Sequence, residues 1–315
     1  MAAFNDSQLT ILVGDCREKL RDLPVESVQT IVTSPPYWGL RDYGNDAQLG
    51  QESTPEEYVS NMVAVFAEAK RVLRKDGTLW LNLGDSYAGS SQLGGTDLSG
   101  LEGWNNGGTR KNPTDVHAKK RGIPSGLKAK DLVGIPWRVA FALQADGWYL
   151  RSEIIWAKPN PMPESVTDRP TKSHEQIFLL SKSPKYFYDA EAIKEEAVTA
   201  GDDRGSRTDN RRGTGYNAKA AGTSITAELR NKRSVWVVPT QPYGGAHFAT
   251  FPPNLIEPCI LAGAPVGGVV LDPFGGSGTT ALVANRLGRK AVLIELNEEY
   301  VELIKERNAQ ASLGI

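Results

Sequence analysis

The sequence predicts an α/β protein with a mainly parallel sheet and helices on both faces of that sheet. Apolar strand-like segments alternate along the chain with amphipathic helical segments, which is the pattern of repeated βαβ units. Two of the strand-like segments end in unusual loops, one with a proline pair after residue 34 and one rich in glycine after residue 272. Open α/β sheets bind ligands at the carboxyl edge of their strands, so both loops are candidates for one functional site.

Seven segments are expected to form strands, near residues 10–15, 29–34, 78–84, 149–157, 175–181, 268–272 and 290–295. Helices are expected between them, near residues 16–22, 131–146, 252–263, 278–287 and 298–309. A further helix begins at Thr54-Pro55-Glu56-Glu57, which supplies an N-cap, a proline in the first turn and early acids. This helix is expected to run to about Lys75, before Asp76-Gly77.

Length and composition are typical of a globular protein that can bury a large core in one domain, or in one domain with an insertion. The chain has 315 residues, of which 40% are hydrophobic and 23% are charged. No apolar run is long enough to span a bilayer, and the N-terminus lacks the basic start and apolar core of a signal peptide. Two cysteines without paired spacing and three histidines argue against a disulfide framework and against a metal site. We therefore expect a cytoplasmic protein without a metal.

The first unusual loop is Thr33-Ser34-Pro35-Pro36-Tyr37-Trp38, which follows the apolar run Gln29-Thr30-Ile31-Val32. Two prolines donate no backbone hydrogen bonds and have fixed φ angles, so the strand must end in a stiff loop. This loop holds a hydroxyl, two proline carbonyls and two aromatic rings close together. Such a group of acceptors beside a ring suits a planar base that carries an amino group. The alternative is a proline turn with buried aromatic side chains.

The second loop belongs to Val269-Val270-Leu271-Asp272-Pro273-Phe274-Gly275-Gly276-Ser277-Gly278-Thr279-Thr280, which indicates a strand, a glycine-rich turn and the start of a helix. It lacks the Gly-x-Gly-x-x-Gly and Gly-Lys-Ser/Thr patterns of dinucleotide and nucleoside triphosphate sites. About 20 residues further on, the next strand ends at Glu295, whose carboxylate can accept hydrogen bonds from a ribose diol. Acids around a nucleoside favour one with a positive centre, such as S-adenosylmethionine. A purely structural glycine turn is the alternative.

Together the two motifs resemble those of the amino-methylating DNA methyltransferases, which modify an exocyclic NH2 of cytosine or adenine. Ser34-Pro35-Pro36-Tyr37 matches the catalytic motif of that family, and Asp272 to Thr279 matches its cofactor motif. The catalytic motif comes first, as in the permuted, beta-type order. The resemblance implies a Rossmann-like S-adenosylmethionine-dependent methyltransferase fold. This fold has a seven-stranded, mostly parallel sheet with helices on both faces and one antiparallel strand.

The resemblance implies a catalytic role for four residues of the proline loop, Ser34, Pro35, Pro36 and Tyr37. Ser34 Oγ and the Pro35 carbonyl would accept hydrogen bonds from the amino group, which favours its pyramidal, nucleophilic form. Pro36 keeps the loop stiff, so these acceptors are organised before the substrate arrives. Tyr37 would stack on a target base that is flipped out of the duplex.

The cofactor site is expected to use acids, glycines and hydroxyls from both loops and from the neighbouring strand ends. Its expected members are Asp15, Thr33, Phe251, Asp272, Phe274, Gly275, Ser277, Gly278, Thr279 and Glu295. The resemblance places Asp272 near the methionine amino group and Asp15 near the adenine amino group. Asp15 could instead be a helix N-cap, Phe251 a core residue and Thr33 an ordinary strand residue. His247 and Trp38 are further candidates with equally good structural explanations.

The chain is expected to form a single methyltransferase domain over residues 1–315, with two segments outside the catalytic frame. Residues 86–128 are rich in Gly, Ser, Asn and Lys, and we expect an inserted flexible basic loop. The resemblance implies that residues 190–240 form the target-recognition region. Basic residues of both segments could contact DNA phosphates, although solvated loops have the same composition. They are Arg110, Lys111, Lys119, Lys120, Arg121, Lys128, Arg204, Arg207, Arg211, Arg212, Lys219, Arg230, Lys232 and Arg233, together with Lys130 just after the first segment.

The leading hypothesis is a site-specific DNA methyltransferase of a restriction-modification system. It would transfer a methyl group from S-adenosylmethionine to N4 of a flipped-out cytosine in double-stranded DNA. Ser34 carries the choice of cytosine, because the family associates Ser with cytosine and Asp with adenine at this position. N6 of adenine is the alternative target, and a catalytically silent DNA-binding module or an RNA or protein-glutamine methyltransferase are further alternatives. The sequence leaves open whether the protein is a monomer or a homodimer, and no membrane partner is expected.

A covalent cytosine-C5 mechanism is disfavoured by the cysteines. Such a mechanism uses a Cys nucleophile, typically next to a proline, at the end of a strand. Pro258-Cys259 has the proline but falls within an expected helix, so Cys259 is expected to be a buried core thiol.

Overall fold

The computed structural model describes residues 2–40, 47–89, 123–197, 229–241 and 251–312. Its strands are β1 Phe4–Asn5, β2 Leu9–Val13, β3 Val28–Thr33, β4 Leu73–Leu83, β5 Tyr149–Ala157, β6 His174–Ser181, β7 Glu195–Glu196, β8 Leu229–Arg230, β9 Val235–Val237, β10 Val269–Asp272 and β11 Lys290–Glu295. Its helices are α1 Cys16–Asp22, α2 Pro55–Val72, α3 Ile135–Ala145, α4 Pro253–Gly263, α5 Thr279–Arg286 and α6 Tyr300–Ser312, with a short 3-10 helix at Glu191–Ile193.

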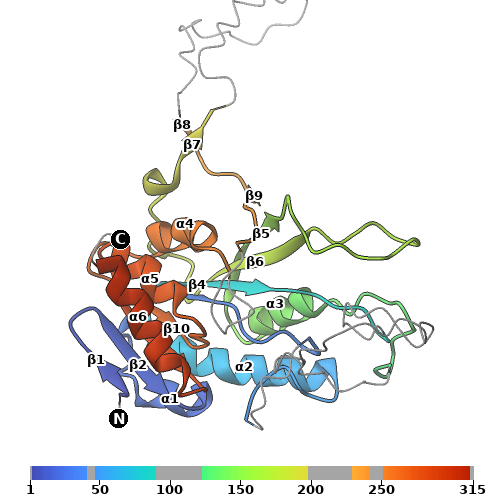
Figure 1. The fold of residues 1–315 in the computed structure, drawn as a ribbon, viewed down its shortest axis with the longest axis horizontal. Coiled ribbons are helices and arrows are strands. Elements are labelled where there is room, and N and C mark those ends of the chain that lie inside the picture. Colours follow the sequence, from blue (N-terminus) through green and yellow to red (C-terminus); the bar gives the residue numbers. More distant parts are fainter. Residues whose placement is uncertain (1, 41–46, 90–122, 198–228, 242–250, 313–315) are drawn as a thin grey trace, which may run out of the picture.

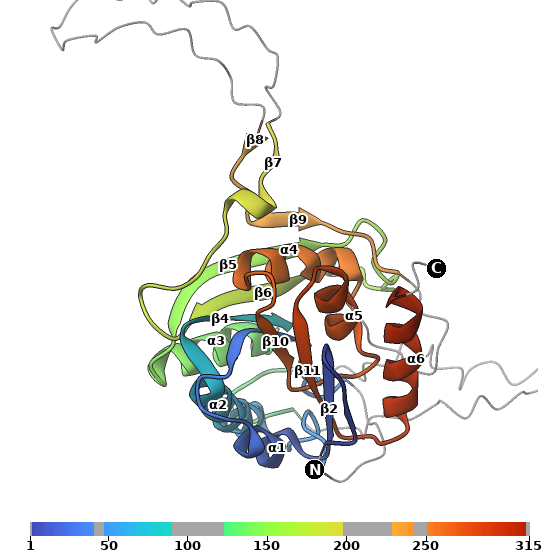
Figure 2. The same ribbon diagram turned by 90° about the vertical axis from the view of Figure 1, so that its left-hand side faces the viewer.

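One twisted sheet organises the molecule, with the strand order β1-β2-β11-β10-β3-β4-β6-β5-β9. Helices α1, α2 and α3 lie on one face, and α4, α5 and α6 lie on the other (Figures 1 and 2). All seven expected strands form, and among them only β6 is antiparallel to its neighbours, β4 and β5. The S-adenosylmethionine-dependent methyltransferase fold expected from the sequence is confirmed.

Two short edge strands extend the expected seven-stranded sheet to nine. β1 pairs antiparallel with β2, and β9 pairs parallel with β5. These strands have two and three residues, which is too short for an alternating pattern of apolar side chains to be recognised.

The helix that begins after Thr54 is three residues shorter than expected. Thr54 Oγ1 accepts a hydrogen bond from Glu57 N at 3.1 Å, as an N-cap does, but the helix ends at Val72. Leu73 already pairs with Val28 of β3, and regular pairing resumes only at Thr78, so residues 74–77 form an irregular stretch of β4. The side chain of Leu73 is fully buried, and its burial favours strand pairing over one more helical turn.

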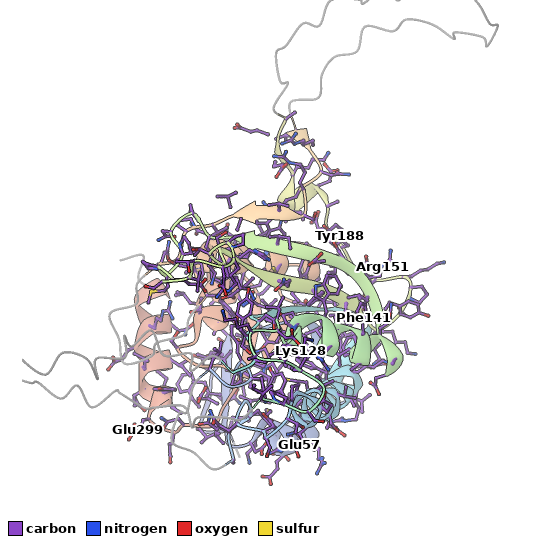
Figure 3. All side chains as sticks on the ribbon, turned by 90° about the vertical axis from the view of Figure 1, so that its right-hand side faces the viewer. Glu57, Lys128, Phe141, Arg151, Tyr188 and Glu299 are labelled. Carbon is purple, nitrogen blue, oxygen red and sulfur yellow. The ribbon has the colours of Figure 1, made fainter. Side chains whose placement is uncertain are left out.

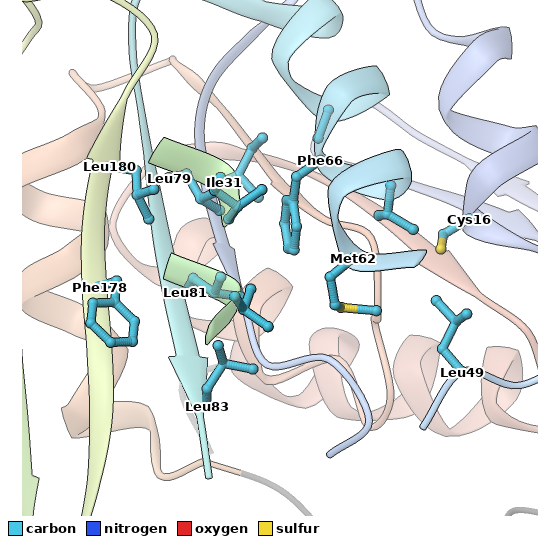
Figure 4. Close-up of a cluster of buried hydrophobic side chains, with 14 of the residues drawn as sticks. Cys16, Ile31, Leu49, Met62, Phe66, Leu79, Leu81, Leu83, Phe178 and Leu180 are labelled. Carbon is cyan, nitrogen blue, oxygen red and sulfur yellow. The ribbon is translucent and has the colours of Figure 1, made fainter. Parts of the chain in front are cut away.

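Two apolar cores lie on the two faces of the sheet. On one face α2 buries Tyr58, Met62, Val65, Phe66 and Ala69, whose spacing places them on one side of the helix. Figure 4 shows Met62 and Phe66 in one cluster with buried side chains of β3, β4 and β6. The other core lies between the sheet and α4, α5 and α6. A sheet with both faces covered in this way has all six residues of β3 buried.

The strand order reverses at the centre of the sheet, between β10 and β3. β10 and β3 are parallel neighbours, and the chain continues outward from β10 to β11 and from β3 to β4. In open α/β sheets the loops that leave two such strands diverge, and ligands bind at the carboxyl ends of these strands. The proline loop follows β3 and the glycine-rich turn follows β10, so both sequence motifs lie at this position.

The two segments outside the catalytic frame are described only in part. Residues 90–122 and 198–228 lie outside the described residues, and so do most of the basic candidates for DNA contact. Tyr87 forms a bridge with Leu132, and β7 and β8 form a separate two-stranded ribbon that stands away from the main sheet beyond α4 (Figures 1 and 2). Among the described helices, none has the length and apolar character needed to cross a membrane.

Charged side chains are exposed on several elements of the described surface. Figure 3 shows Glu57 and Glu299 at the lower edge of the view and Lys128 near its centre, and all three side chains are exposed. Phe141 on α3 is an exposed aromatic exception and packs against the neighbouring Trp137 with ring centroids 5.5 Å apart.

Candidate active site

The two sequence motifs meet at the centre of the carboxyl edge of the sheet. Thr33 Oγ1 donates a hydrogen bond to Asp272 Oδ1 at 2.6 Å, which joins positions 239 residues apart. Thr280 Oγ1, on the first turn of α5, donates to the other carboxylate oxygen of Asp272 at 2.7 Å. The expected neighbourhood of the catalytic and cofactor motifs is therefore present, and Thr33 is the residue that links them.

Hydrogen bonds with α2 and with the segment that precedes α2 fix the proline loop. Tyr58 Oη donates to the Pro36 carbonyl at 3.0 Å, and Trp38 Nε1 donates to the Glu52 carbonyl at 3.0 Å. Pro35 is buried, whereas Ser34 is half-buried at the edge of the site. These contacts keep the loop stiff, and Trp38 belongs to the core that faces α2.

A polar cluster surrounds the hydroxyl of Tyr37. Tyr37 Oη donates to Glu175 Oε2 at 2.8 Å and accepts a hydrogen bond from Ser34 Oγ at 3.2 Å. Asn82 Nδ2 donates to Tyr37 Oη and to Glu175 Oε2. Lys158 Nζ forms a close ion pair with Glu175 Oε1, and it also lies 4.2 Å from the centre of the Trp156 ring.

The charges of this cluster follow from its burial and its partners. Burial alone would raise the pKa of Glu175. The ammonium of Lys158 and the hydrogen bonds from Asn82 and Tyr37 outweigh burial, so the pKa of Glu175 lies below its usual value and the carboxylate is ionised. Burial and the nearby negative charge of Glu175 raise the pKa of Tyr37 well above its usual value, so Tyr37 remains a neutral hydroxyl.

The ring of Tyr37 passes very close to the backbone of Gly84, directly after β4. A Cβ atom at position 84 would lie 2.5 Å and 2.7 Å from two carbons of the ring. On the other side of the loop, a Cβ atom at Gly50 would lie 3.0 Å from the Tyr37 carbonyl, and Gly50 has a φ of +92°. Two glycines therefore make the space in which Tyr37 is fixed.

Asp272 is a buried carboxyl at the end of β10, with only 2% of its surface exposed. Besides Thr33 and Thr280, the backbone N–H of Phe274 donates to it at 3.0 Å. Burial raises the pKa of Asp272 to about 7 against the effect of these three hydrogen bonds, and the negative charge of Glu295 adds to the increase.

Glu295 ends β11, the strand next to β10. Its two oxygens accept hydrogen bonds from Gly276 N at 2.6 Å and from Asn297 N at 2.9 Å. Burial raises the pKa of Glu295 above its usual value. Two buried carboxyl groups with raised pKa values at the ends of neighbouring strands suit a ligand with a positive centre, so the residues present fit S-adenosylmethionine.

The hydroxyls and the last glycine of the turn face α6. Arg307 Nη1 donates to Ser277 Oγ at 2.7 Å and to Thr279 Oγ1 at 2.9 Å. A Cβ atom at Gly278 would lie 2.9 Å from Ile304 Cγ2, and one at Gly275 would lie 3.2 Å from Leu293 Cβ. The structure therefore gives these four residues a packing role, and their contact with a cofactor stays a prediction.

We expect Gly278→Ala to destabilise the protein more than Gly267→Ala does. Both glycines have nearly the same φ, +77° and +78°, so both variants carry backbone strain of about 1–3 kcal/mol. Only the new methyl group at position 278 meets Ile304, because nothing lies within 4 Å of a Cβ atom at Gly267. Urea unfolding of both variants measures the difference, and equal losses would contradict the proposed packing against α6.

The remaining expected site residues have structural contacts of their own. Asp15 accepts hydrogen bonds from the backbone and side chain of Arg17 and is the N-cap of α1. Phe274 packs partly against the core on the α2 side, and Phe251 packs against the core on the α4 side. His247 lies outside the described residues. Contacts of Asp15, Phe251 and Phe274 with a cofactor stay predictions.

Sequence reasoning missed four residues of the site. They are Asn82, Lys158, Glu175 and Thr280. Asn82 is a single amide in the apolar run Leu79–Leu83, and this polar interruption of a buried strand was a usable signal. Lys158 and Glu175 flank the loop between β5 and β6, and their pairing depends on the antiparallel direction of β6.

The fold and the site define an S-adenosylmethionine-dependent methyltransferase. The structure is similar to that of the PvuII DNA methyltransferase (cytosine-N4-specific), with a TM-score of 0.64 and 19% identity over 99% of this chain and 92% of the other. It is also similar to TTHA0409 of Thermus thermophilus, solved in complex with S-adenosyl-L-methionine. That comparison has a TM-score of 0.59 and 25% identity over 97% of this chain and 95% of the other.

A family model described as DNA methylase, of the N6/N4 methyltransferases, matches residues 28–306, and the chain belongs to this family. Among curated proteins, the chain is 50% identical to the type II methyltransferase M.Cfr9I of Citrobacter freundii, over 95% of this chain and 87% of the relative. It is 49% identical to the type II methyltransferase M.SmaI of Serratia marcescens, over 94% of this chain and 89% of the relative. The family expected from the proline and glycine motifs is confirmed.

Proposed function

We propose that this protein transfers a methyl group from S-adenosylmethionine to N4 of cytosine in double-stranded DNA. The observation that carries the proposal is the Thr33–Asp272 hydrogen bond, which places the proline loop directly beside the acidic end of β10. Relatives at about half identity are named type II methyltransferases, which supports a role in modification within a restriction-modification system.

The proline loop supplies the groups that a base amine needs. The lone pair of an exocyclic amine is delocalised into the ring, so the amine attacks poorly until hydrogen-bond acceptors engage its protons. Ser34 Oγ and the Pro35 carbonyl are the proposed acceptors. Because the loop is held by Tyr58 and Trp38, these acceptors need no reorganisation when the base arrives.

The cofactor would supply a methyl group on a sulfonium, and residues at the ends of β10 and β11 would hold it. Asp272 is proposed to face the ammonium of the methionine part, and Glu295 is proposed to accept hydrogen bonds from the ribose hydroxyls. Alignment of the amine with the methyl group contributes much of the acceleration in such an in-line displacement.

We expect cofactor affinity to decrease as pH falls below 7. The pKa of Asp272 is about 7 in the free protein, so at lower pH a proton must leave before the carboxylate can pair with the ammonium. The dissociation constant is therefore expected to rise about tenfold per pH unit well below pH 7. Calorimetric titration with S-adenosylmethionine from pH 5 to 7 measures this slope.

The matched control for the pH experiment is Asp272→Asn, which keeps the shape of the side chain and cannot ionise. This variant should bind the cofactor more weakly and with a smaller pH dependence. Glu295→Gln separates the contribution of the second acid, whose pKa is also raised. An affinity of the unchanged protein that is constant from pH 5 to 7 would exclude the proposed pairing of Asp272 with the ammonium.

The choice of cytosine over adenine rests on Ser34, which the family associates with cytosine. Either amine could use the same acceptors, so N6 of adenine is the second candidate. Incubation of the protein with labelled S-adenosylmethionine and DNA, followed by digestion to nucleosides, identifies the methylated base. We expect the label on N4-methylcytosine, and label only on N6-methyladenine would overturn the cytosine assignment.

DNA binding and base flipping complete the proposal, because a target amine inside a duplex is out of reach of the loop. The described basic candidates already have partners. Arg230 and Arg233 pair with Glu195, and Lys128 pairs with Asp131. Surface pairs of this kind are weak and can exchange for phosphate contacts. Target recognition by residues 190–240, a cytoplasmic location and a homodimer stay predictions.

A further inference from the structure

Five polar groups form a continuous chain that ends at Ser34. Lys158 follows β5, Glu175 lies in β6, Asn82 lies in β4, and Tyr37 and Ser34 follow β3. Lys158 donates to one oxygen of Glu175, while Tyr37 and Asn82 donate to the other, at 2.8 and 3.0 Å for the latter two contacts. Of these five residues, only Ser34 is expected to touch the target amine.

The donor and acceptor roles in this chain follow from the ionised carboxylate. A carboxylate only accepts hydrogen bonds, so the single hydroxyl hydrogen of Tyr37 is directed at Glu175. Tyr37 Oη then faces Ser34 with its lone pairs and accepts the Ser34 hydrogen at 3.2 Å. The hydrogen of Ser34 is directed at Tyr37, and one lone pair of Ser34 Oγ accepts a hydrogen bond from Asn82 Nδ2 at 3.3 Å. The second lone pair of Ser34 Oγ is left to accept from an N–H group.

We propose that Glu175 is a positioning residue that sets the direction of the hydrogen bonds from Tyr37 to Ser34, so that Ser34 Oγ accepts from the target amine. This inference rests on the proposed amino methylation at Ser34, and it applies to N4 of cytosine and N6 of adenine alike. Lys158 completes the arrangement, because it holds Glu175 ionised and occupies the carboxylate oxygen that Tyr37 and Asn82 do not use.

Glu175→Gln tests the direction of the chain while keeping the shape of the side chain. The ammonium of Lys158 is a donor only, so the new amide must turn its oxygen toward Lys158. Its NH2 group then faces Tyr37 Oη, so Tyr37 accepts a hydrogen bond from position 175, whereas in the unchanged protein it donates one to Glu175. Tyr37 can now donate to Ser34, which leaves Ser34 Oγ occupied. We expect kcat to fall about 10- to 100-fold.

The other measured quantities should not change in Glu175→Gln. KM for DNA and the dissociation constant for S-adenosylmethionine are expected to stay within about twofold of the unchanged protein, because Glu175 touches neither ligand in the proposal. The matched control is Glu164→Gln in the same β5–β6 hairpin, where the carboxylate pairs with Arg169 instead. This control should keep its kcat. A Glu175→Gln protein with unchanged kcat would overturn the proposal.

A second substitution distinguishes the direction of hydrogen bonds from simple structural support. Adding Lys158→Met to Glu175→Gln removes the donor that fixes the amide, so the amide oxygen can turn toward Tyr37. We expect part of the lost kcat to return, although the double variant has lost more native contacts than the single one. A further decrease of kcat in the double variant would indicate structural support alone and would contradict the proposal.

A cycle with Ser34→Ala shows whether Glu175 acts through Ser34. In the Ser34→Ala protein, Glu175→Gln should cause little further loss of kcat, whereas independent roles would give multiplied losses. Multiplied losses would overturn the proposal. The base methylated by the unchanged protein is identified in the same assay. Label on adenine would contradict the cytosine assignment and leave these comparisons valid, whereas no transfer to any DNA would overturn the proposed function and this inference with it.

Discussion

Ser34→Ala is expected to lower the rate of methyl transfer about 10²- to 10³-fold and to leave cofactor binding unchanged. Loss of one organised hydrogen-bond partner at a reacting group has an effect of this size in other enzymes. The Ser34 hydroxyl is half-buried and hydrogen-bonded only to Tyr37 and Asn82 among the described residues, so its removal leaves the Thr33–Asp272 contact in place. Single-turnover methylation of DNA measures the rate, and titration with S-adenosylmethionine measures cofactor binding.

A matched control lies at the other end of the same strand. Ser27 directly precedes β3 and donates to the Pro24 carbonyl at 2.8 Å, far from the carboxyl edge of the sheet. Ser27→Ala should therefore retain the full rate of transfer. If Ser34→Ala lost cofactor binding as strongly as it lost methyl transfer, the assignment of Ser34 to the target amine would be wrong.

Gly84→Ala is the second substitution with a large expected effect. The new methyl group would lie within 2.7 Å of two ring carbons of Tyr37, so the ring must move. Tyr37 Oη would then leave Glu175, and the proposed stacking surface for the base would shift with it. A displacement of about 1 Å at a reacting group can cost about 100-fold in rate, and we expect a loss of about 10- to 100-fold in kcat.

Combining Gly84→Ala with Tyr37→Ala tests whether the effect of Gly84→Ala comes from displacement of the Tyr37 ring. Removal of the ring removes the three atoms nearest to the new methyl group, so the double variant should be about as stable to urea as Tyr37→Ala alone. Cofactor affinity should stay close to that of the unchanged protein in all three variants. Retention of the full methylation rate by Gly84→Ala would contradict the conclusion that the ring of Tyr37 is held in its functional position.

The sequence predicts the parts of this molecule that depend on local pattern. The seven main strands have clear runs of apolar residues, and the proline and glycine motifs identify which two of them end at the site. Their adjacency follows from the family resemblance and from the rule that ligands bind where the strand order reverses. For this reason the sequence predicts that the loops that contain Ser34 and Asp272 lie at one site, and the structure adds the hydrogen bond between Thr33 and Asp272.

Other parts depend on tertiary contacts that leave no local pattern. Glu175 lies beside Tyr37 because β6 runs antiparallel, which brings the first residues of that strand to the carboxyl edge of its neighbours. Ser277 and Thr279 fit a ligand-binding turn by sequence, yet their hydroxyls bind Arg307 once α6 docks. Leu73 ends α2 early because its side chain is buried where β4 pairs with β3. Each of these outcomes was decided by packing between distant segments.

The central position of β3 has a consequence for the order of synthesis. β3 needs two neighbours, β4 and β10, and β10 leaves the ribosome long after β3 and β4 have done so. Until β10 is made, one edge of β3 has no strand to pair with. All six residues of β3 are buried in the folded protein, so the unpaired strand exposes surface that the finished sheet covers. Nascent chains that stop between β6 and β10 should therefore depend on chaperones and aggregate without them. Arrested ribosome complexes of increasing length would locate the point at which this dependence ends.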